Sequence, residues 1–441
     1  MRVSRKIAAI IAAAAMGVLF VSCSKNQASG QGGQVGDGAA EAAEQTAEAV
    51  TEAEPVLTMV PPTEDDLHHA MVDRSYLSHG NDYRIRNKLD KALNGEKVTV
   101  AYIGGSITEG AGGTPENCYA KLSCNYIAER YGTGDNVEYV NAGVSGTPSI
   151  LGNLRLQKDV LDYEPDIVFV EFAVNDGMEK LYKDSYESML RTILQQENEP
   201  AVILLFTVTS TGHTCQPHMS ELGEYYELPM ISVPDAIQPE IEAGRMSWAD
   251  YSNDEAHPNM EGHKLVAEFI SYWFEKSEFS SDVAPATSYA IKPLPKFGNP
   301  YENAFLAVGD YDNSNENIQI GDTGSFSLEE RRIADFTKGA WVYTGEGTEP
   351  LKMTVKGNTL FFVCKRNNSS TMGSFDVYID GEKVTTINTN QSDGWGEPYA
   401  FQAIKWQGIH DMEVEVVPTE DSIGKTIEIF GIACSQNESF M

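Results

Sequence analysis

The sequence predicts a two-domain protein, in which a three-layer α/β domain with a parallel sheet flanked by helices precedes an all-β sandwich. Three observations lead to this prediction. Strand and helix patterns alternate over about residues 98–274, and the last third instead carries short strands between turn signals. The length of 441 residues exceeds one ordinary domain, and the 41% hydrophobic fraction is sufficient for sizeable cores.

The N-terminus predicts an export signal. Basic residues within Met1–Lys6 precede an uncharged run over 7–20, which is too short for an ordinary spanning helix. A small residue before Cys23 resembles the lipobox of bacterial lipoproteins, with Phe20 where leucine is usual. We expect a lipoprotein signal peptide over 1–22 and lipidation of Cys23. The alternative is ordinary cleavage, with Cys23 incidental.

A tether follows the signal peptide. Residues 24 to about 56 are rich in Gly, Gln, Ala and Glu and contain no aromatic residue, so they cannot bury enough apolar surface to order themselves. We expect a disordered acidic tether over 23–60. The predicted location is extracellular, on the bacterial cell surface, with membrane contact through the lipid anchor only.

The α/β pattern extends over 61–282. Runs such as VTVAYI and AVILLF are almost continuously apolar, which is typical of parallel strands buried on both faces. We expect strands over 98–103, 138–141, 166–172, 201–206 and 228–233. We expect helices over 119–131, 154–161, 186–195, 219–226 and 262–274. Ligands of such sheets bind at the carboxyl ends of the strands, so the residues that follow each strand matter most.

Four short blocks stand after predicted strands or before the last helix. They are GGSIT at 104–108, NAGVSG at 141–146, FAVND at 172–176 and DEAH at 254–257. Together they contain a serine that follows two glycines, candidate hydrogen-bond donors, and an Asp/His pair three residues apart. These are the components of acyl transfer through an activated nucleophile.

The order of these blocks resembles that of the SGNH (GDSL-like) hydrolase family. The resemblance covers about residues 85–275 and implies a flavodoxin-like three-layer fold. Each block alone is a weak signal, whereas four blocks in order are a strong one. One departure is Gly105, where many members carry Asp. That Asp is not the triad acid, so the implied chemistry is unaffected.

The resemblance also implies a role for each residue. Ser106 would be the nucleophile, His257 the general base, and Asp254 the acid that orients the imidazole. The oxyanion would be met by the backbone N–H groups of Ser106 and Gly146 and by the Asn175 amide. Taken singly, each of these residues has a structural alternative as a turn or capping residue.

No metal or cofactor is expected. Neither HExxH nor a CxxC spacing occurs, and His263 is better explained as part of the start of the last helix than as a ligand. His213 and His218 either rim the pocket or are simply exposed. The five cysteines other than Cys23 are expected to be mainly buried, inert thiols.

Prolines mark a linker over 283–302, and a β-sandwich of jelly-roll type is expected over 303–441. The predicted strands cover 340–343, 351–355, 359–364, 374–379, 383–387, 401–405, 411–417 and 426–433. Five aromatic residues offer stacking faces for sugars, or else serve as packing: Trp341, Tyr343, Trp395, Tyr399 and Trp406.

Charge and motifs together define the predicted function. With 32 basic and 65 acidic residues the net charge is −33, which disfavours nucleic acid as a partner. We expect a serine esterase that removes short-chain, mainly acetyl, groups from extracellular polysaccharide or oligosaccharide. A lipase, lysophospholipase or thioesterase would use the same triad, and acetyl transfer between sugars the same acyl-enzyme. A non-catalytic glycan-binding lipoprotein is the alternative from another class.

Overall fold

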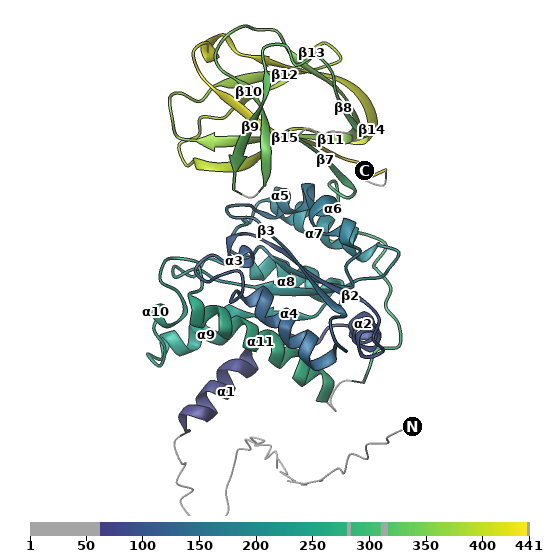
Figure 1. Cartoon of the computed structure of the whole chain (residues 1–441), viewed down its shortest axis with the longest axis vertical. Coiled ribbons are helices and arrows are strands. Elements are labelled where there is room, and N and C mark those ends of the chain that lie inside the picture. Colours follow the sequence, from purple (N-terminus) through teal and green to yellow (C-terminus); the bar gives the residue numbers. More distant parts are fainter. Residues whose placement is uncertain (1–61, 280–283, 310–315, 335, 439–441) are drawn as a thin grey trace, which may run out of the picture. The chain divides into compact units, whose positions relative to one another are not determined.

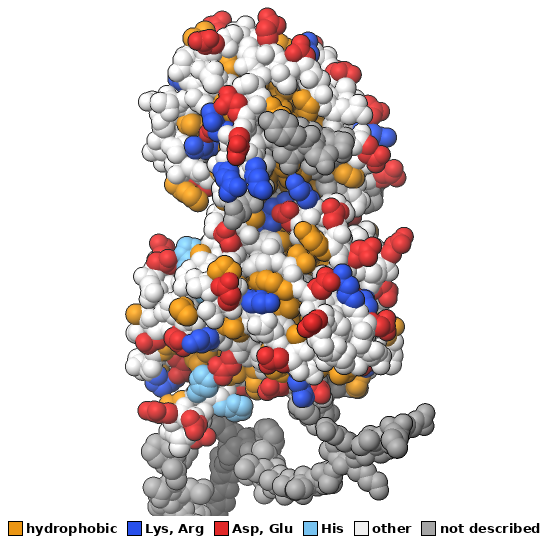
Figure 2. All heavy atoms as spheres, in the orientation of Figure 1, with side chains coloured by type: hydrophobic (Ala, Val, Ile, Leu, Met, Phe, Trp, Pro, Cys, Tyr) orange, Lys and Arg blue, Asp and Glu red, His pale blue; other side chains and the backbone are white. Residues whose placement is uncertain are grey.

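The computed structural model describes residues 62–279, 284–309, 316–334 and 336–438 (Figure 1). The predicted signal peptide, Cys23 and the tether over 23–60 lie outside this part. In the described part of the chain, no helix combines the length and the apolar character needed to cross a bilayer. Figure 2 shows acidic side chains spread over the visible face of both domains.

The first domain is built on a six-stranded sheet within the described residues, in the order β1-β6-β5-β4-β2-β3. The strands are β1 (Tyr76–Ser78), β2 (Val98–Gly104), β3 (Val137–Gly143), β4 (Ile167–Glu171), β5 (Ala201–Phe206) and β6 (Met230–Ser232). All neighbouring pairs are parallel except β1 with β6. The parallel strands therefore present their carboxyl ends along one edge, where the four sequence blocks meet.

Helices cover both faces of this sheet (Figure 1). They are α1 (Glu64–Arg74), α2 (Tyr83–Leu93), α3 (Ser106–Glu109), α4 (Tyr119–Tyr131), α5 (Ser149–Leu154), α6 (Leu156–Asp159), α7 (Lys180–Leu194), α8 (Gln216–Tyr225), α9 (Val233–Glu242), α10 (Trp248–Tyr251) and α11 (Met260–Phe279). Alternate residues of each strand enter two different cores: Val100 and Tyr102 pack with α4 and α11, whereas Ala101 and Ile103 pack with α7 and α8.

The second domain is antiparallel. Its strands are β7 (Ala304–Val308), β8 (Ile318–Ile320), β9 (Ser327–Ile333), β10 (Thr337–Tyr343), β11 (Leu351–Asn367), β12 (Ser374–Ile379), β13 (Glu382–Asn388), β14 (Trp395–Pro418) and β15 (Ile427–Ser435). All strand pairings found among the described residues of this domain are antiparallel. Their inward side chains, including Trp341 and Phe362, form a separate core. The predicted fold class, an α/β domain followed by a β-sandwich, is confirmed.

The two domains also share a hydrophobic cluster. Ile150, Leu151 and Leu154 of α5 pack with Phe361 and with other side chains of the sandwich. The connecting segment is fixed to α7, because the buried Glu187 carboxylate accepts hydrogen bonds from three consecutive backbone N–H groups over 296–298. The domains therefore meet through packed side chains.

Three of the differences between the structure and the sequence-based elements have a clear physical reason. The helix expected over 154–161 is replaced by α5 and α6, which meet at Arg155. Helix α9 was missed because it contains two prolines, one in its first turn and one in its interior. The pairs of short strands predicted at 351–364 and 401–417 are the single strands β11 and β14, because Gly357-Asn358 forms an irregularity in the ladder instead of a turn.

Candidate active site

Ser106 lies just beyond the carboxyl end of β2, which pairs with β3 on one side and β4 on the other. It is the first residue of the short helix α3, and 9% of its surface is exposed. Two glycines make this tight connection possible. A Cβ on Gly104 would come within 2.1 Å of Thr108 Oγ1, and a Cβ on Gly105 within 2.3 Å of the Asn175 amide. Asn175 thus occupies the space that a side chain at position 105 would fill.

His257 and Asp254 complete a chain of hydrogen bonds from Ser106. The distance from Ser106 Oγ to His257 Nε2 is 2.8 Å, and that from His257 Nδ1 to Asp254 Oδ2 is also 2.8 Å. With the imidazole proton on Nδ1 facing the carboxylate, Nε2 is an acceptor for the serine hydroxyl proton. This is the arrangement needed to activate a serine.

The loop that carries Asp254 fixes the carboxylate. Its Oδ1 accepts the backbone N–H groups of Ala256 at 2.8 Å and His257 at 2.7 Å. Burial raises the pKa of Asp254, but the hydrogen bonds from His257 and Ala256 outweigh this effect and lower the pKa to about 2. Ser252 braces the same loop by donating to the His257 carbonyl at 2.6 Å. Asp254 is therefore ionised at neutral pH, as an orienting acid must be.

The two other predicted oxyanion donors follow neighbouring strands. Gly146 comes after β3 with φ +71°, a left-handed conformation that favours glycine. Asn175 comes after β4, and no hydrogen bond from its side chain to another described residue is found. The structure thus brings the glycine and asparagine blocks to the same end of the sheet as Ser106.

Buried carboxyl groups support this end of the sheet. Glu171 accepts hydrogen bonds from Thr108 and Thr207, and Asp176 accepts the Ser149 backbone N–H at 2.7 Å. Burial raises the pKa of Glu171 to about 7 and that of Asp176 to about 8. Asp176 links the asparagine block to α5. Only the Asn-Asp pair hinted at this role in the sequence.

The other histidines near the site are structural. His263 Nδ1 accepts the Tyr119 backbone N–H at 3.2 Å, and Nε2 donates to the Ala111 carbonyl at 3.1 Å. His218 is buried, which lowers its pKa to about 4. His213 is exposed, and its Nε2 lies 3.1 Å from the Asp176 carbonyl oxygen. The described residues contain no group of three or more His, Cys, Asp or Glu side chains placed to hold a metal ion.

Cysteines have no evident part in this chemistry. The five described ones, Cys118, Cys124, Cys215, Cys364 and Cys434, are free and buried. Burial raises the pKa of Cys124 to about 11 and that of Cys215 to about 12, so these thiols are protonated and unreactive at neutral pH.

The sandwich also reaches this site. A Cβ on Gly146 would come 2.7 Å from Trp395 Cζ2, although 67% of the Trp395 surface is exposed. The buried Glu397 holds the start of β14 by accepting hydrogen bonds from the backbone N–H groups of Trp395 and Gly396 at 2.8 and 2.9 Å. Arg366 in turn pairs with Glu397. In the sequence Trp395 is one of five aromatic candidates of the sandwich, and no local pattern selects it.

Comparison with known proteins identifies the first domain. Residues 102–265 match the model of the GDSL-like Lipase/Acylhydrolase family, and this match covers all four sequence blocks. The matched region, residues 102–265, is a GDSL-like lipase/acylhydrolase domain. The predicted family and the prediction of a carboxylic ester hydrolase are confirmed. We refer to this part as the esterase domain.

Solved structures resemble both domains together. A two-domain esterase (CEX) active on acetylated mannans, co-crystallised with mannopentaose, is 26% identical with a TM-score of 0.70, and the match covers 84% of this chain and 99% of that one. A second structure of a two-domain esterase (CEX) active on acetylated mannans gives 26% identity, a TM-score of 0.71 and coverage of 83% and 99%. A comparison with curated proteins finds no match.

Proposed function

We propose that this protein is a serine esterase that removes acetyl groups from extracellular polysaccharide through a Ser106-His257-Asp254 triad. The observation that carries the proposal is the continuous hydrogen-bonded chain from Ser106 Oγ through His257 to Asp254, with both bonds at 2.8 Å. The likeness of both domains to esterases active on acetylated mannans supports an acetylated glycan as the substrate class.

The proposed reaction has two steps. Ser106 Oγ attacks the acetyl carbonyl while His257 Nε2 takes the hydroxyl proton. The tetrahedral oxyanion is stabilised by the backbone N–H groups of Ser106 and Gly146 and by the side-chain amide of Asn175. His257 returns the proton to the sugar oxygen as its bond to the acyl carbon breaks, which leaves an acetyl-enzyme. A water molecule then gives a proton to His257 and attacks the acyl carbon. The bond to Ser106 Oγ breaks, acetate leaves, and His257 returns the proton to Oγ.

Trp395 favours a sugar over a lipid chain in this site. An exposed indole beside Gly146 offers a flat face for the C–H groups of a pyranose, and aromatic rings with polar surroundings commonly bind such ligands. The surroundings of Trp395 are polar, because its backbone N–H donates to the Glu397 carboxylate, which also pairs with Arg366. One aromatic face with polar neighbours suits a sugar ring better than an acyl chain, which is bound best by continuous apolar surface.

The proposed location follows from the N-terminus. The basic start, the uncharged run and Cys23 support export and lipidation, and the acidic stretch after Cys23 would hold the enzyme away from the membrane. A tethered enzyme of this kind acts on polymers outside the cell. The net charge of −33 supports neutral glycans over nucleic acid as partners.

Acetate release tests the proposal. Wild-type protein and the Ser106→Ala variant are assayed on acetylated glucomannan, acetylated xylan and p-nitrophenyl acetate. We expect release from at least one polymer and from the small ester, both lost in the variant. Activity on the small ester alone would reject the polysaccharide assignment and favour the lipase or thioesterase alternative. No activity from folded protein would favour the glycan-binding alternative.

A further inference from the structure

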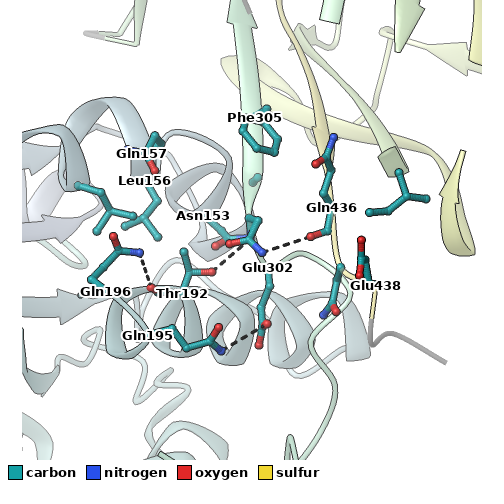
Figure 3. Close-up of a pocket in the computed structure, with 15 residues that line it drawn as sticks. Asn153, Leu156, Gln157, Thr192, Gln195, Gln196, Glu302, Phe305, Gln436 and Glu438 are labelled. Atoms are coloured by element: carbon teal, nitrogen blue, oxygen red, sulfur yellow. Dashed lines mark hydrogen bonds between the residues drawn. The ribbon is translucent and has the colours of Figure 1, made fainter. Parts of the chain in front are cut away.

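A cavity lies between the two domains, and Ser106 is not among the residues that line it. Its volume is about 520 Å³, within the range of about 300–1,000 Å³ that is usual for ligand pockets. Residues at the C-terminal end of α7 line one side, and Phe305 of β7 and Gln436 line the other (Figure 3). None of the proposed catalytic residues lines it. The start of α7, close to the Asn175 block, is about 20 Å away along this helix.

Amide groups dominate the lining. Seven of the lining residues are asparagines or glutamines, and none is Lys, Arg or His. Of the two carboxylates, the buried Glu302 is neutralised by an ion pair with Arg191, and Glu438 is exposed. A phosphate or carboxylate ligand would find no cation in this lining, so the chemistry favours a neutral ligand with many hydroxyl groups.

Three of the lining amides are hydrogen-bonded through their NH₂ groups. Asn153, which is only 1% exposed, donates from Nδ2 to the Tyr301 carbonyl at 2.7 Å. Gln196 donates from Nε2 to the Thr192 carbonyl at 2.9 Å, and Gln157 donates in the same way to Asp162 at 2.8 Å. No hydrogen bond from a described residue reaches the side-chain oxygen of Asn153, Gln157 or Gln196. Three braced acceptors therefore remain for hydroxyl donors.

Apolar side chains stand among these acceptors. Leu156, Leu161, Phe305 and Ile409 also line the cavity, and Phe305 is half-buried. A pyranose ring presents hydroxyl groups at its rim and C–H groups on its faces, which match this mixture of amides and apolar surfaces. We propose that this cavity is a second glycan site, which binds a neutral stretch of the polysaccharide chain whose esters Ser106 cleaves.

The identity of the glycan in this inference rests on the proposed function. A second site on the same molecule raises the effective concentration of the polymer at Ser106 without changing the chemistry. It would act on long chains and leave small esters untouched. It would also bind chains without acetyl groups, because no part of its lining depends on an ester.

Binding of unacetylated oligosaccharides tests the site without catalysis. Full-length protein with Ser106→Ala and Trp395→Ala is titrated by calorimetry with β-1,4-mannohexaose and β-1,4-xylohexaose. To this background we add Gln196→Trp, which fills the cavity, or the control Glu197→Trp at the exposed neighbouring position. Melting temperatures of the variants exclude misfolding.

We expect the background protein and the Glu197→Trp control to bind at least one hexaose, and Gln196→Trp to weaken that binding at least tenfold. Equal affinities of the two tryptophan variants, or no binding by the background protein, would overturn the inference. Esterase activity of wild-type protein on acetylated polymers is measured separately. Its absence would reject the proposed function, whereas the titration alone decides whether the cavity binds a glycan.

Discussion

The proposed catalytic residues and Trp395, the first residue of β14, meet beside Gly146, but their surroundings are built differently. Ser106, His257 and Asp254 all come from the esterase domain and are joined by hydrogen bonds of 2.8 Å. Trp395 comes from the sandwich, is 67% exposed, and contacts the esterase domain at a glycine. Under the proposed function this difference corresponds to two tasks: one domain would supply the chemistry for any small ester, and the other would add a surface that only a larger substrate reaches.

The largest effect is expected at Asp254. In Asp254→Asn the amide cannot accept both backbone N–H groups and also hold the Nδ1 proton of His257. We expect kcat to fall by about 10⁴-fold on p-nitrophenyl acetate and polymer alike. Glu255→Gln, at the exposed neighbouring residue, is the control. A loss of less than tenfold on both substrates would contradict the triad.

The next effect is expected at Asn175. Removing its amide in Asn175→Ala should lower kcat by about 10²–10³-fold on both substrates, since one oxyanion donor is lost. Steady-state kinetics on the small ester and the polymer measure this change. An equal loss on both substrates assigns Asn175 to the chemistry. A loss confined to the polymer would instead group it with Trp395 as a binding residue.

A smaller and selective effect is expected at Trp395. In Trp395→Ala we expect kcat/KM on the polymer to fall about tenfold, the size of effect typical of a buried aromatic contact. The small ester should be hydrolysed at the wild-type rate. Ile423→Ala removes another exposed apolar side chain of the sandwich and serves as the control. Equal losses on both substrates would show that the two tasks are not separated.

The last effect is on stability instead of activity, and it concerns the buried carboxyl groups that support the catalytic side. An Asp in the unfolded chain titrates near pH 4, whereas burial raises the pKa of Asp176 to about 8. Between these values the folded state keeps a proton that the unfolded state has lost, so stability should fall as pH rises from about 4 to about 8. Asp176→Asn retains an oxygen for the Ser149 N–H and cannot ionise.

Urea denaturation at pH 5 and pH 8 measures this effect. We expect the wild-type free energy of unfolding to drop more between these two values than that of Asp176→Asn. Glu171, which has a raised pKa of about 7, leaves a residual slope of the same sign in the variant. Parallel changes in both proteins would mean that Asp176 is already ionised in the folded state.

The sequence predicts the fold class and the group around Ser106 for a common physical reason. Each block follows a strand or precedes α11, and the parallel sheet brings such positions to one edge. The place of Trp395 is different, because it depends on how two domains pack together, and Trp395 and Gly146 are more than 200 residues apart in the sequence. No local pattern distinguishes the exposed Trp395 from Trp341, which is 1% exposed in the sandwich core.

The packing of α5 against the sandwich limits how far the two domains can be separated. Three aliphatic side chains of this helix, which begins three residues after Gly146, are covered by the sandwich. Cutting the chain after α11 would expose them to water and free the segment that presents the Gly146 N–H. The sandwich therefore cannot be removed or exchanged without exposing the apolar side chains of α5. Any recombined enzyme would have to keep α5 and its apolar partners together to remain soluble and active.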